Sequence, residues 1–246
     1  MTERVEAAFD RDQLTKLLGL AQGAVLVGGQ AVAFWASFFN VPVPAVLGAY
    51  VTKDSDFLGD RADVARIANG MQGAATYAHR RGLAALVGQV KIDLSATAFL
   101  NIDVLHRIVG FADADALRRR AEERSLDGVR FRVMHPVDCL RSRIENLHKI
   151  AEKRSESGVA QSGLAVRIVK RYLETVLEAE NEPLALKAIE NVVNMAFRPA
   201  GRLAFGKFDI DVLEAIPVER ISNRKFRDVR WPQILTQAGA RRRRKS

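Results

Sequence analysis

Three aspartates in two apolar segments are the side chains of this sequence best suited to holding a metal ion. Asp54 and Asp56 are separated by one residue in segment 52–57, and Asp103 lies within segment 101–105. Alternate side chains of a strand share one face, so we expect the carboxylates of Asp54 and Asp56 to lie side by side. Carboxylates in apolar surroundings repel one another unless a cation lies between them. Their hard oxygen atoms favour Mg²⁺ or Mn²⁺.

A pair of glycines ends another short apolar run. Residues 24–27 lead into Gly28 and Gly29, and a helical pattern of apolar residues continues from Gln30 to Phe39. Glycine lets the backbone approach a ligand closely, and the first N–H groups of a helix bind anions. We therefore expect Gly28, Gly29 and Gln30 to bind phosphate. Glycine pairs are also frequent in ordinary turns, and acid-x-acid pairs also occur at solvated strand ends.

A further aspartate competes with Asp103 for the role of third carboxylate. Asp93 lies in the short segment 91–94, which we expect to form a strand next to that of Asp103. Segment 98–105 around Asp103 is longer and has more apolar flanks, so Asp103 is the preferred assignment.

The order of these segments resembles the nucleotidyltransferase superfamily typified by DNA polymerase beta. That family has a Gly-Gly or Gly-Ser pair after an apolar residue, then an acid-x-acid pair, then a third acid on an adjacent strand. Residues 27–29, 52–57 and 102–104 match this order, over about the first half of the chain. The chain looks closest to the bacterial branch with abortive-infection and toxin–antitoxin nucleotidyltransferases, in which a full helix follows the glycine pair. It departs in a longer gap than the polymerases have and in Gly29, where serine is common.

The resemblance implies a reaction and a role for each motif. Asp54, Asp56 and Asp103 would be catalytic and would ligate Mg²⁺ or Mn²⁺, and Asp103 would also help to activate the acceptor hydroxyl. Gly28 and Gly29 would contact the phosphates of a nucleoside triphosphate such as ATP. The expected enzyme moves a nucleoside monophosphate to a hydroxyl of RNA such as tRNA, of a protein or of a small molecule. A cognate antitoxin protein is a further expected partner.

The alternative interpretation is a non-catalytic module that keeps the nucleotidyltransferase fold and binds nucleic acid or protein. It draws on the basic residues, which give the chain a formal net charge of +9. Such a charge attracts RNA, DNA and nucleotide phosphates. Intact acids favour the enzyme over this alternative.

The pattern of apolar residues becomes helical after Met134. We predict an α/β (α+β) nucleotidyltransferase core over residues 1–134, with a small mixed sheet flanked by helices. A helical domain over 135–200 and a C-terminal extension with a basic tail over 201–246 follow. The expected helices cover residues 5–20, 60–80, 137–152, 163–178 and 183–197, and the expected strands of the later core cover 83–90, 90–94 and 98–105.

Basic residues outside the acid motifs are candidates for holding the nucleotide. Lys53 adjoins the acid pair, and Arg143 and Lys149 lie in an expected helix whose stripe of Leu140, Ile144 and Leu147 should face the core. Solvated helix faces carry similar charges, and this applies also to the basic stripe at 167–171. The run Arg241–Lys245 is either an arm that contacts phosphate groups or a solubilising tail.

The sequence also argues against several classes of protein. Cys139 is the one cysteine, so neither an internal disulfide nor a cysteine-rich zinc site can form. The four histidines lack metal-ligand spacing, and no serine or cysteine lies in a nucleophile motif. The uncharged stretch 17–52 is interrupted by glycine, asparagine and proline, so we expect no membrane span. The first residues lack the pattern of a secretory signal, and we expect a cytoplasmic protein.

Overall fold

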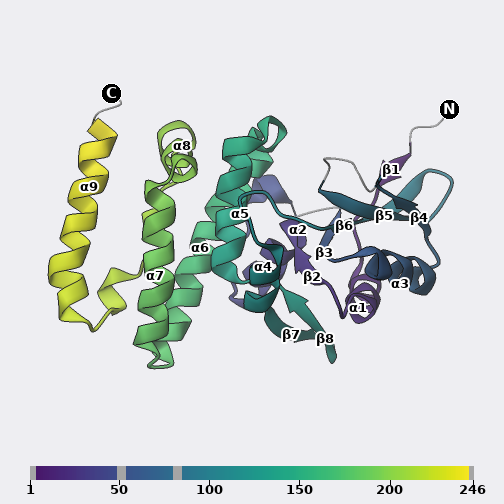
Figure 1. The fold of residues 1–246 in the computed structure, drawn as a ribbon, viewed down its shortest axis with the longest axis horizontal. Coiled ribbons are helices and arrows are strands. Elements are labelled where there is room, and N and C mark those ends of the chain that lie inside the picture. The colour runs from purple at the N-terminus through teal and green to yellow at the C-terminus, as the bar shows by residue number, and fades with distance from the viewer. Residues whose placement is uncertain (1–3, 49–53, 80–84, 244–246) are drawn as a thin grey trace. The chain divides into compact units, whose positions relative to one another are not determined.

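The computed structural model describes residues 4–48, 54–79 and 85–243, and Figure 1 shows its fold. Contacts within the chain divide it into two compact units. The first unit comprises residues 1–34 and 47–142 and contains the sheet. The second comprises residues 35–46 and 143–246 and is helical.

A mixed sheet of eight strands forms the centre of the first unit, as far as the chain is described. Its order is β4-β5-β6-β3-β2-β8-β7, with β1 paired to β6. The pairs β3–β6, β2–β8 and β1–β6 are parallel, and the others are antiparallel. The strands are β1 (Val5–Glu6), β2 (Val25–Val27), β3 (Ser55–Leu58), β4 (Ala74–Tyr77), β5 (Leu86–Asp93), β6 (Ala98–Leu105), β7 (Glu122–Leu126) and β8 (Val129–Val133). A mixed sheet flanked by helices confirms the expected α/β (α+β) class.

One face of the sheet is apolar and packs against helices α1 (Arg11–Leu20) and α3 (Arg61–Met71). Phe57 and Val104 are register partners on β3 and β6, and each is at most 1% exposed. Val64 of α3 lies against Gly88 of β5, where an added Cβ atom would come within 3.2 Å of it. Removing each such side chain from water contributes about 1.5–3 kcal/mol. A large part of the core of the first unit therefore lies on this face.

Helix α1 begins later than the predicted helix over residues 5–20. Asp10 caps it, since its side chain accepts a hydrogen bond from the Gln13 N–H at 2.8 Å, and the Gln13 side chain accepts one from the Asp10 N–H at 3.1 Å. This capping box fixes the first turn at Arg11. Residues Val5–Glu6 pair with β6 instead. The prediction was wrong there because pairing with a distant strand outweighs local helical spacing.

Helix α3 is shorter than the predicted helix over residues 60–80. It ends at Met71, because Gln72 adopts a left-handed conformation with φ 56°. The following residues form the edge strand β4, paired to β5. The strands expected at 83–90 and 90–94 are described as one strand, β5. Strand pairing again replaces a locally plausible assignment.

The hairpin of β7 and β8 and the short helix α4 (Ala114–Arg120) were not predicted. Asp127 and Gly128 form the hairpin turn, and both have positive φ, 49° and 80°. Asp-Gly between two short strands is a recognised hairpin signal. This signal was present in the sequence and could have located the hairpin.

The second unit is built from helices joined by short turns. Its main helices are α6 (Glu156–Glu178), α7 (Glu182–Phe197), α8 (Pro199–Phe208) and α9 (Trp231–Arg243). Before and between them lie the short 3-10 helices η2 (Ala151–Arg154), η3 (Val212–Ala215) and η4 (Val218–Arg220) and the π-helix η5 (Lys225–Arg230). Helix α6 begins before the expected residue 163, because Ser155 caps it by accepting a hydrogen bond from the Gly158 N–H at 3.3 Å. Residues 155–158, a polar segment between two expected helices, are thus the cap and the first turn of this helix.

Two helices belong partly to each unit, α2 (Gly28–Phe38) and α5 (Pro136–Lys149), and a short turn, η1, covers Ala45–Leu47. The units divide between residues 142 and 143, inside α5, rather than near 134. A change in the pattern of apolar residues marks where a helix starts. This need not be where the chain divides into compact units.

The residues expected to form a separate extension over 201–246 cluster with the second unit, in which Val212 and Leu213 are buried. The expected stripe of Leu140, Ile144 and Leu147 is buried, as predicted. None of the helices in the described part of the chain combines the length and the apolar character needed to cross a bilayer.

Candidate active site

A row of polar side chains crosses the second face of the sheet. Asp56 of β3 is the register partner of Asp103 on β6, and Asp103 is the register partner of Gln89 on β5. Gln89 pairs in turn with Thr76 on the edge strand β4. Register partners on neighbouring strands point to the same face, about 4.8 Å apart. The sheet therefore places the two acids, which are distant in the sequence, next to each other.

The residues of this polar row are partly exposed. Asp56, Asp103 and Gln89 are half-buried and Thr76 is exposed. By contrast, Phe57 and Val104, each the next residue on its strand, are buried on the apolar face. The acids therefore lie on the face opposite Phe57 and Val104, where Val27, the register partner of Asp56, and Leu58 are also fully buried.

Gly28 lies directly against the carboxylate of Asp56. It follows β2, opens helix α2 and has φ +67°. A Cβ atom at this position would lie 2.0 Å from Oδ2 of Asp56, far inside van der Waals contact. The positive φ and the close approach both require glycine here. The glycine turn thus lies against Asp56, one residue of the predicted acid-x-acid pair.

Gly29 and Gln30 form the first turn of α2. The first N–H groups of a helix have no partner within the helix, and its positive end favours an anion. Gly29 is buried and Gln30 is partly exposed. An anion bound at this helix end would lie near the Asp56 carboxylate, against which Gly28 packs. The purely structural interpretation is that the positive helix end favours the Asp56 carboxylate itself.

Asp54 lies in a bend just before β3 and is partly exposed. The register between β3 and β6 begins at Ser55, which pairs with Ile102. The expectation that Asp54 and Asp56 share one face assumed an extended strand through both residues. The strand begins one residue after Asp54, so the alternation argument applies to Asp56 and not to Asp54.

Asp56 and Asp103 are the carboxylates best placed to hold one metal ion together. In the described parts of the chain, no three His, Cys, Asp or Glu side chains lie close enough to form a metal site from protein ligands alone. Mg²⁺ is commonly held by one or two carboxylates, with waters and substrate phosphates completing its shell. The donor set fits such an ion, because the carboxylate pair stands beside a helix end suited to phosphate.

Asp93 is poorly placed to act as the third carboxylate. Its side chain is 70% exposed and forms an ion pair with Arg4. Its register partner is Phe99, near the start of β6. Along a strand this is about 13 Å from Asp103. The register therefore favours Asp103, the residue that the sequence analysis preferred.

Two amides that the sequence analysis did not single out bind the Asp103 carboxylate. Gln89 Nε2 donates a hydrogen bond to Asp103 Oδ1 at 2.9 Å. Asn101 Nδ2 donates to the same oxygen at 3.4 Å. The alternation of Asn101 and Asp103 along one strand was a signal for the second contact. The first depends on the register between β5 and β6, which the sequence does not reveal.

Two of the basic residues predicted to hold the nucleotide have partners within the helical unit. Lys53 lies outside the described residues. Arg143 donates to Gln161 Oε1 at 2.8 Å, and Lys149 forms an ion pair with Glu145 at 2.9 Å. Both contacts lie within the helical unit. Their role in holding a triphosphate stays a prediction.

The basic stripe expected at 167–171 is divided between two environments. Arg171 forms ion pairs with Glu174 at 3.1 Å and with Glu178 at 3.5 Å. Arg167 and Lys170 line a hollow of about 560 Å³ in the helical unit. Its other lining residues are Val166, Asp211, Leu213, Glu214, Ile216, Val218, Glu219, Trp231 and Leu235. Acids and bases share this hollow, so it lacks the uniform positive charge expected of a nucleic-acid groove.

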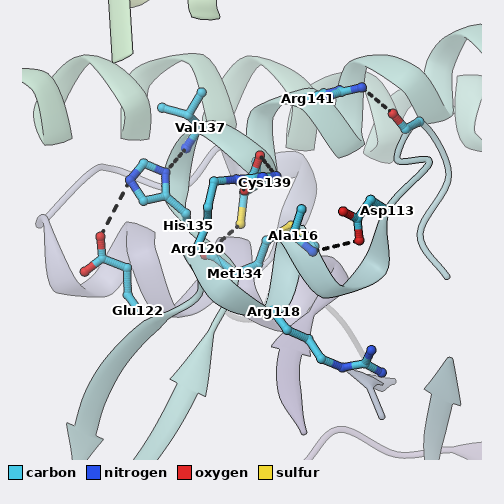
Figure 2. Close-up of polar contacts among 12 residues, drawn as sticks. Asp113, Ala116, Arg118, Arg120, Glu122, Met134, His135, Val137, Cys139 and Arg141 are labelled. Carbon is cyan, nitrogen blue, oxygen red and sulfur yellow. Dashed lines mark hydrogen bonds and ion pairs between the residues drawn. The ribbon is translucent and has the colours of Figure 1, made fainter. Parts of the chain in front are cut away.

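A second polar cluster lies where helix α5 begins (Figure 2). His135 Nδ1 accepts a hydrogen bond from the Val137 N–H at 3.2 Å, and Nε2 lies 3.6 Å from Glu122 Oε1. Arg120 donates two hydrogen bonds to the Asp138 carboxylate, at 2.9 and 3.2 Å. Burial lowers the pKa of His135, and the guanidinium groups nearby act in the same direction. This cluster caps and anchors the helix.

Comparisons of the chain with protein-family models, with curated proteins and with solved structures found no match. The class of protein must therefore be argued from the fold and the site. Together these comprise a mixed α/β sheet, an acid pair on adjacent strands and a glycine turn at a helix end.

Proposed function

We propose that this chain is a metal-dependent nucleotidyltransferase that moves a nucleoside monophosphate from a nucleoside triphosphate to a hydroxyl acceptor. The observation that carries the proposal is the meeting of three sequence motifs at one place. Asp56 and Asp103 are register partners, and Gly28 packs against the Asp56 carboxylate. Acids that bind a cation and a helix end that binds phosphate are the two halves of such a site.

In this reaction one group of residues binds the triphosphate and another residue accepts a proton. Gly28, Gly29 and Gln30 bind the triphosphate at the start of α2. The acceptor oxygen forms a bond to the α-phosphorus while the bond to the bridging oxygen breaks, and pyrophosphate leaves. Asp103 takes the proton of the acceptor hydroxyl. Catalysis of this kind consists mainly of positioning and of charge stabilisation.

Asp56 and Asp103, with Asp54 as a further ligand, would hold Mg²⁺ or Mn²⁺. When bound, the ion neutralises charge on the phosphate oxygens that accumulates during transfer. A carboxylate pair without a cation would retain its mutual repulsion. The chemistry of the donor set, all hard oxygen atoms, suits these ions.

Charge along the sequence favours RNA as the acceptor. Residues 220–246 contain ten basic residues and one acidic residue, while residues 1–219 contain 28 of each. The whole net charge of +9 therefore resides in the last part of the given sequence. A concentrated positive charge attracts the phosphate backbone of a nucleic acid. A protein acceptor or a cognate antitoxin has no comparable support among the described features.

The test is transfer of label from α-³²P nucleoside triphosphates to total RNA, in the presence of Mg²⁺. The matched variants are Asp56→Asn and Asp103→Asn, with Asp93→Asn as the control on the same sheet face. We expect the first two to lose at least about a hundredfold in rate, as removal of a group that stabilises transferred charge commonly does. Asp93→Asn should retain activity. Equal activity in all three variants would overturn the assignment.

The second candidate function is a non-catalytic module of the same fold that binds nucleic acid. The charge of residues 220–246 favours it as much as it favours an RNA acceptor. It predicts that wild-type protein transfers no label yet binds RNA, with an affinity that falls steeply as salt is raised. Label transfer and RNA binding, measured on the same protein preparations, distinguish the two functions.

A further inference from the structure

We propose that Gln89 is a positioning residue that orients the Asp103 carboxylate toward the metal ion and the acceptor. The inference rests on the proposed function, because it assigns a role within that site. Gln89 touches neither cation nor substrate in this scheme and acts through Asp103. Its amide holds Oδ1, so that Oδ2 is the oxygen presented to the ligand.

The hydrogen bonds to Asp103 all fall on one side of its carboxylate. Gln89 Nε2 donates to Oδ1 at 2.9 Å, and Asn101 Nδ2 donates to Oδ1 at 3.4 Å. Within the described residues, Oδ2 receives no hydrogen bond. A carboxylate fixed through one oxygen has its plane and its second oxygen fixed as well. Such outer contacts commonly set how a ligand faces its metal ion.

An amide is the donor type that this position requires. Asp56 and Asp103 occupy neighbouring strands, about 4.8 Å apart, and repel each other in the absence of a cation. A lysine or arginine in place of Gln89 would neutralise Asp103 and remove the charge that attracts the cation. An amide N–H orients the carboxylate and leaves its negative charge in place.

Asn101 supports the same interpretation. The residue is 8% exposed, and its Oδ1 atom is buried without a hydrogen-bond partner among the residues that the structure describes. Leaving a buried carbonyl oxygen unpaired is unfavourable. The Asn101 side chain is therefore held through its Nδ2 atom, which donates a hydrogen bond to Asp103 Oδ1. Two amides from two strands converge on one carboxylate oxygen.

The position of Gln89 argues against a role in stability alone. Its register neighbour on the outer side, Thr76, is exposed, and Gln89 is itself half-buried. The side chains that fill the core alternate with it and face α3, as Val90 does. Loss of the Gln89 amide should therefore change the behaviour of Asp103 more than the stability of the sheet.

The experiment compares Gln89→Met, which keeps the length of the side chain and removes the donor, with Thr76→Val as a control in the same row. Binding of Mn²⁺ alone is measured by electron paramagnetic resonance titration, without nucleotide. We expect Gln89→Met to weaken Mn²⁺ binding about tenfold, as the loss of an outer contact to a metal ligand does. Thr76→Val should bind as wild type, and the melting temperature of both should stay close to that of wild type.

The same titration on Asp56→Asn and Asp103→Asn separates failure of this inference from failure of the proposed function. Loss of Mn²⁺ binding in both acid variants with unchanged binding in Gln89→Met overturns the role of Gln89 alone. Wild-type binding in all four variants overturns the metal site and the inference with it. If Gln89→Met binds Mn²⁺ more weakly and its melting temperature also falls well below that of wild type, the role of Gln89 is structural and the inference is overturned.

Discussion

Single residues account for the geometry of the candidate site. Gly28 is the clearest case, because no other residue type allows the Asp56 carboxylate to lie where it does. Gln89 and Asn101 hold Asp103 through one oxygen. The site is thus made by side chains that are individually ordinary and that become specific through their contacts.

Gly28→Ala should disturb the site and lower stability. The left-handed conformation costs a residue with a Cβ atom about 1–2 kcal/mol, and the new methyl group would displace Asp56. Gly48→Ala is the matched control, since Gly48 has φ +66° and open space around it. Chemical denaturation should show a similar backbone penalty in both variants. Loss of label transfer in Gly28→Ala only would confirm the contact with Asp56, whereas equal loss would contradict it.

His135 should make stability depend on pH. Burial is the main reason that its pKa is lowered below the usual 6.5, although Glu122 and Asp138 act in the opposite direction. Between the folded pKa and 6.5, the unfolded chain therefore binds more protons than the folded chain. The free energy of unfolding should fall as pH is lowered through this window, because the buried imidazole must then take up a proton in surroundings that disfavour its charge.

Denaturation curves at several pH values on either side of 6.5 measure this effect. His135→Asn keeps a cap acceptor and does not titrate, so its stability should vary less with pH in that window. His106→Asn replaces an exposed histidine and serves as the control. A wild-type pH dependence in His135→Asn would show that other groups cause it.

Capping residues determine where the helices begin, and pairing with neighbouring strands determines where the short strands form. Asp10, Asp60 and Ser155 each accept a hydrogen bond from the first turn of the helix that follows, and these helices start where the caps require. Strands β1 and β4 exist because other strands lie beside them. Helix starts are therefore local features, and short strands are not.

Asp60→Ala should destabilise the first unit through helix α3. The Asp60 side chain accepts hydrogen bonds from the N–H groups of Ala62 at 2.8 Å and Asp63 at 3.1 Å. Loss of such a cap costs about 1 kcal/mol. Asp60→Asn retains the acceptor and should lose much less. Urea denaturation of the two variants checks this, and equal losses would show that the charge rather than the cap matters.

Across the whole molecule, acidic and basic residues are unevenly distributed. The sheet-containing unit has 17 basic and 16 acidic residues, and the helical unit has 21 and 13. Nucleic acid should therefore be attracted mainly by the helical unit. Its hollow beside Arg167 and Lys170 also contains acids, which leaves residues 220–246 as the main source of positive charge.

Removing residues 241–246 should weaken binding to single-stranded RNA and reduce its salt dependence. Five cations are lost, and each phosphate contact contributes about 0.7 to the slope of log K against log salt concentration. The slope should fall in magnitude by up to about 3.5. Replacing Arg241–Lys245 by glutamine keeps the length and should give the same result. An unchanged slope in both variants would show that the tail does not contact phosphate.

The motifs themselves could be identified from the sequence. Gly28-Gly29, the acids at 54, 56 and 103, the fold class and the buried stripe of α5 follow from residue types and from short-range periodicity. These features depend on neighbours in the chain, and their signal is therefore local. The Asp-Gly turn of the hairpin was equally local and could have been found in the same way.

Pairing between distant strands was not contained in that local pattern. Only the folded sheet places Asp56 beside Asp103, adds Gln89 to Asp103, and separates Asp93 from both. The alternation of apolar residues disfavours a shift of one residue, which would turn each of these side chains to the other face. Which strands pair, and in which of the registers two residues apart, is not fixed by the residues of one strand. The choice is made by burial of the apolar face against α1 and α3, which involves the whole sheet at once.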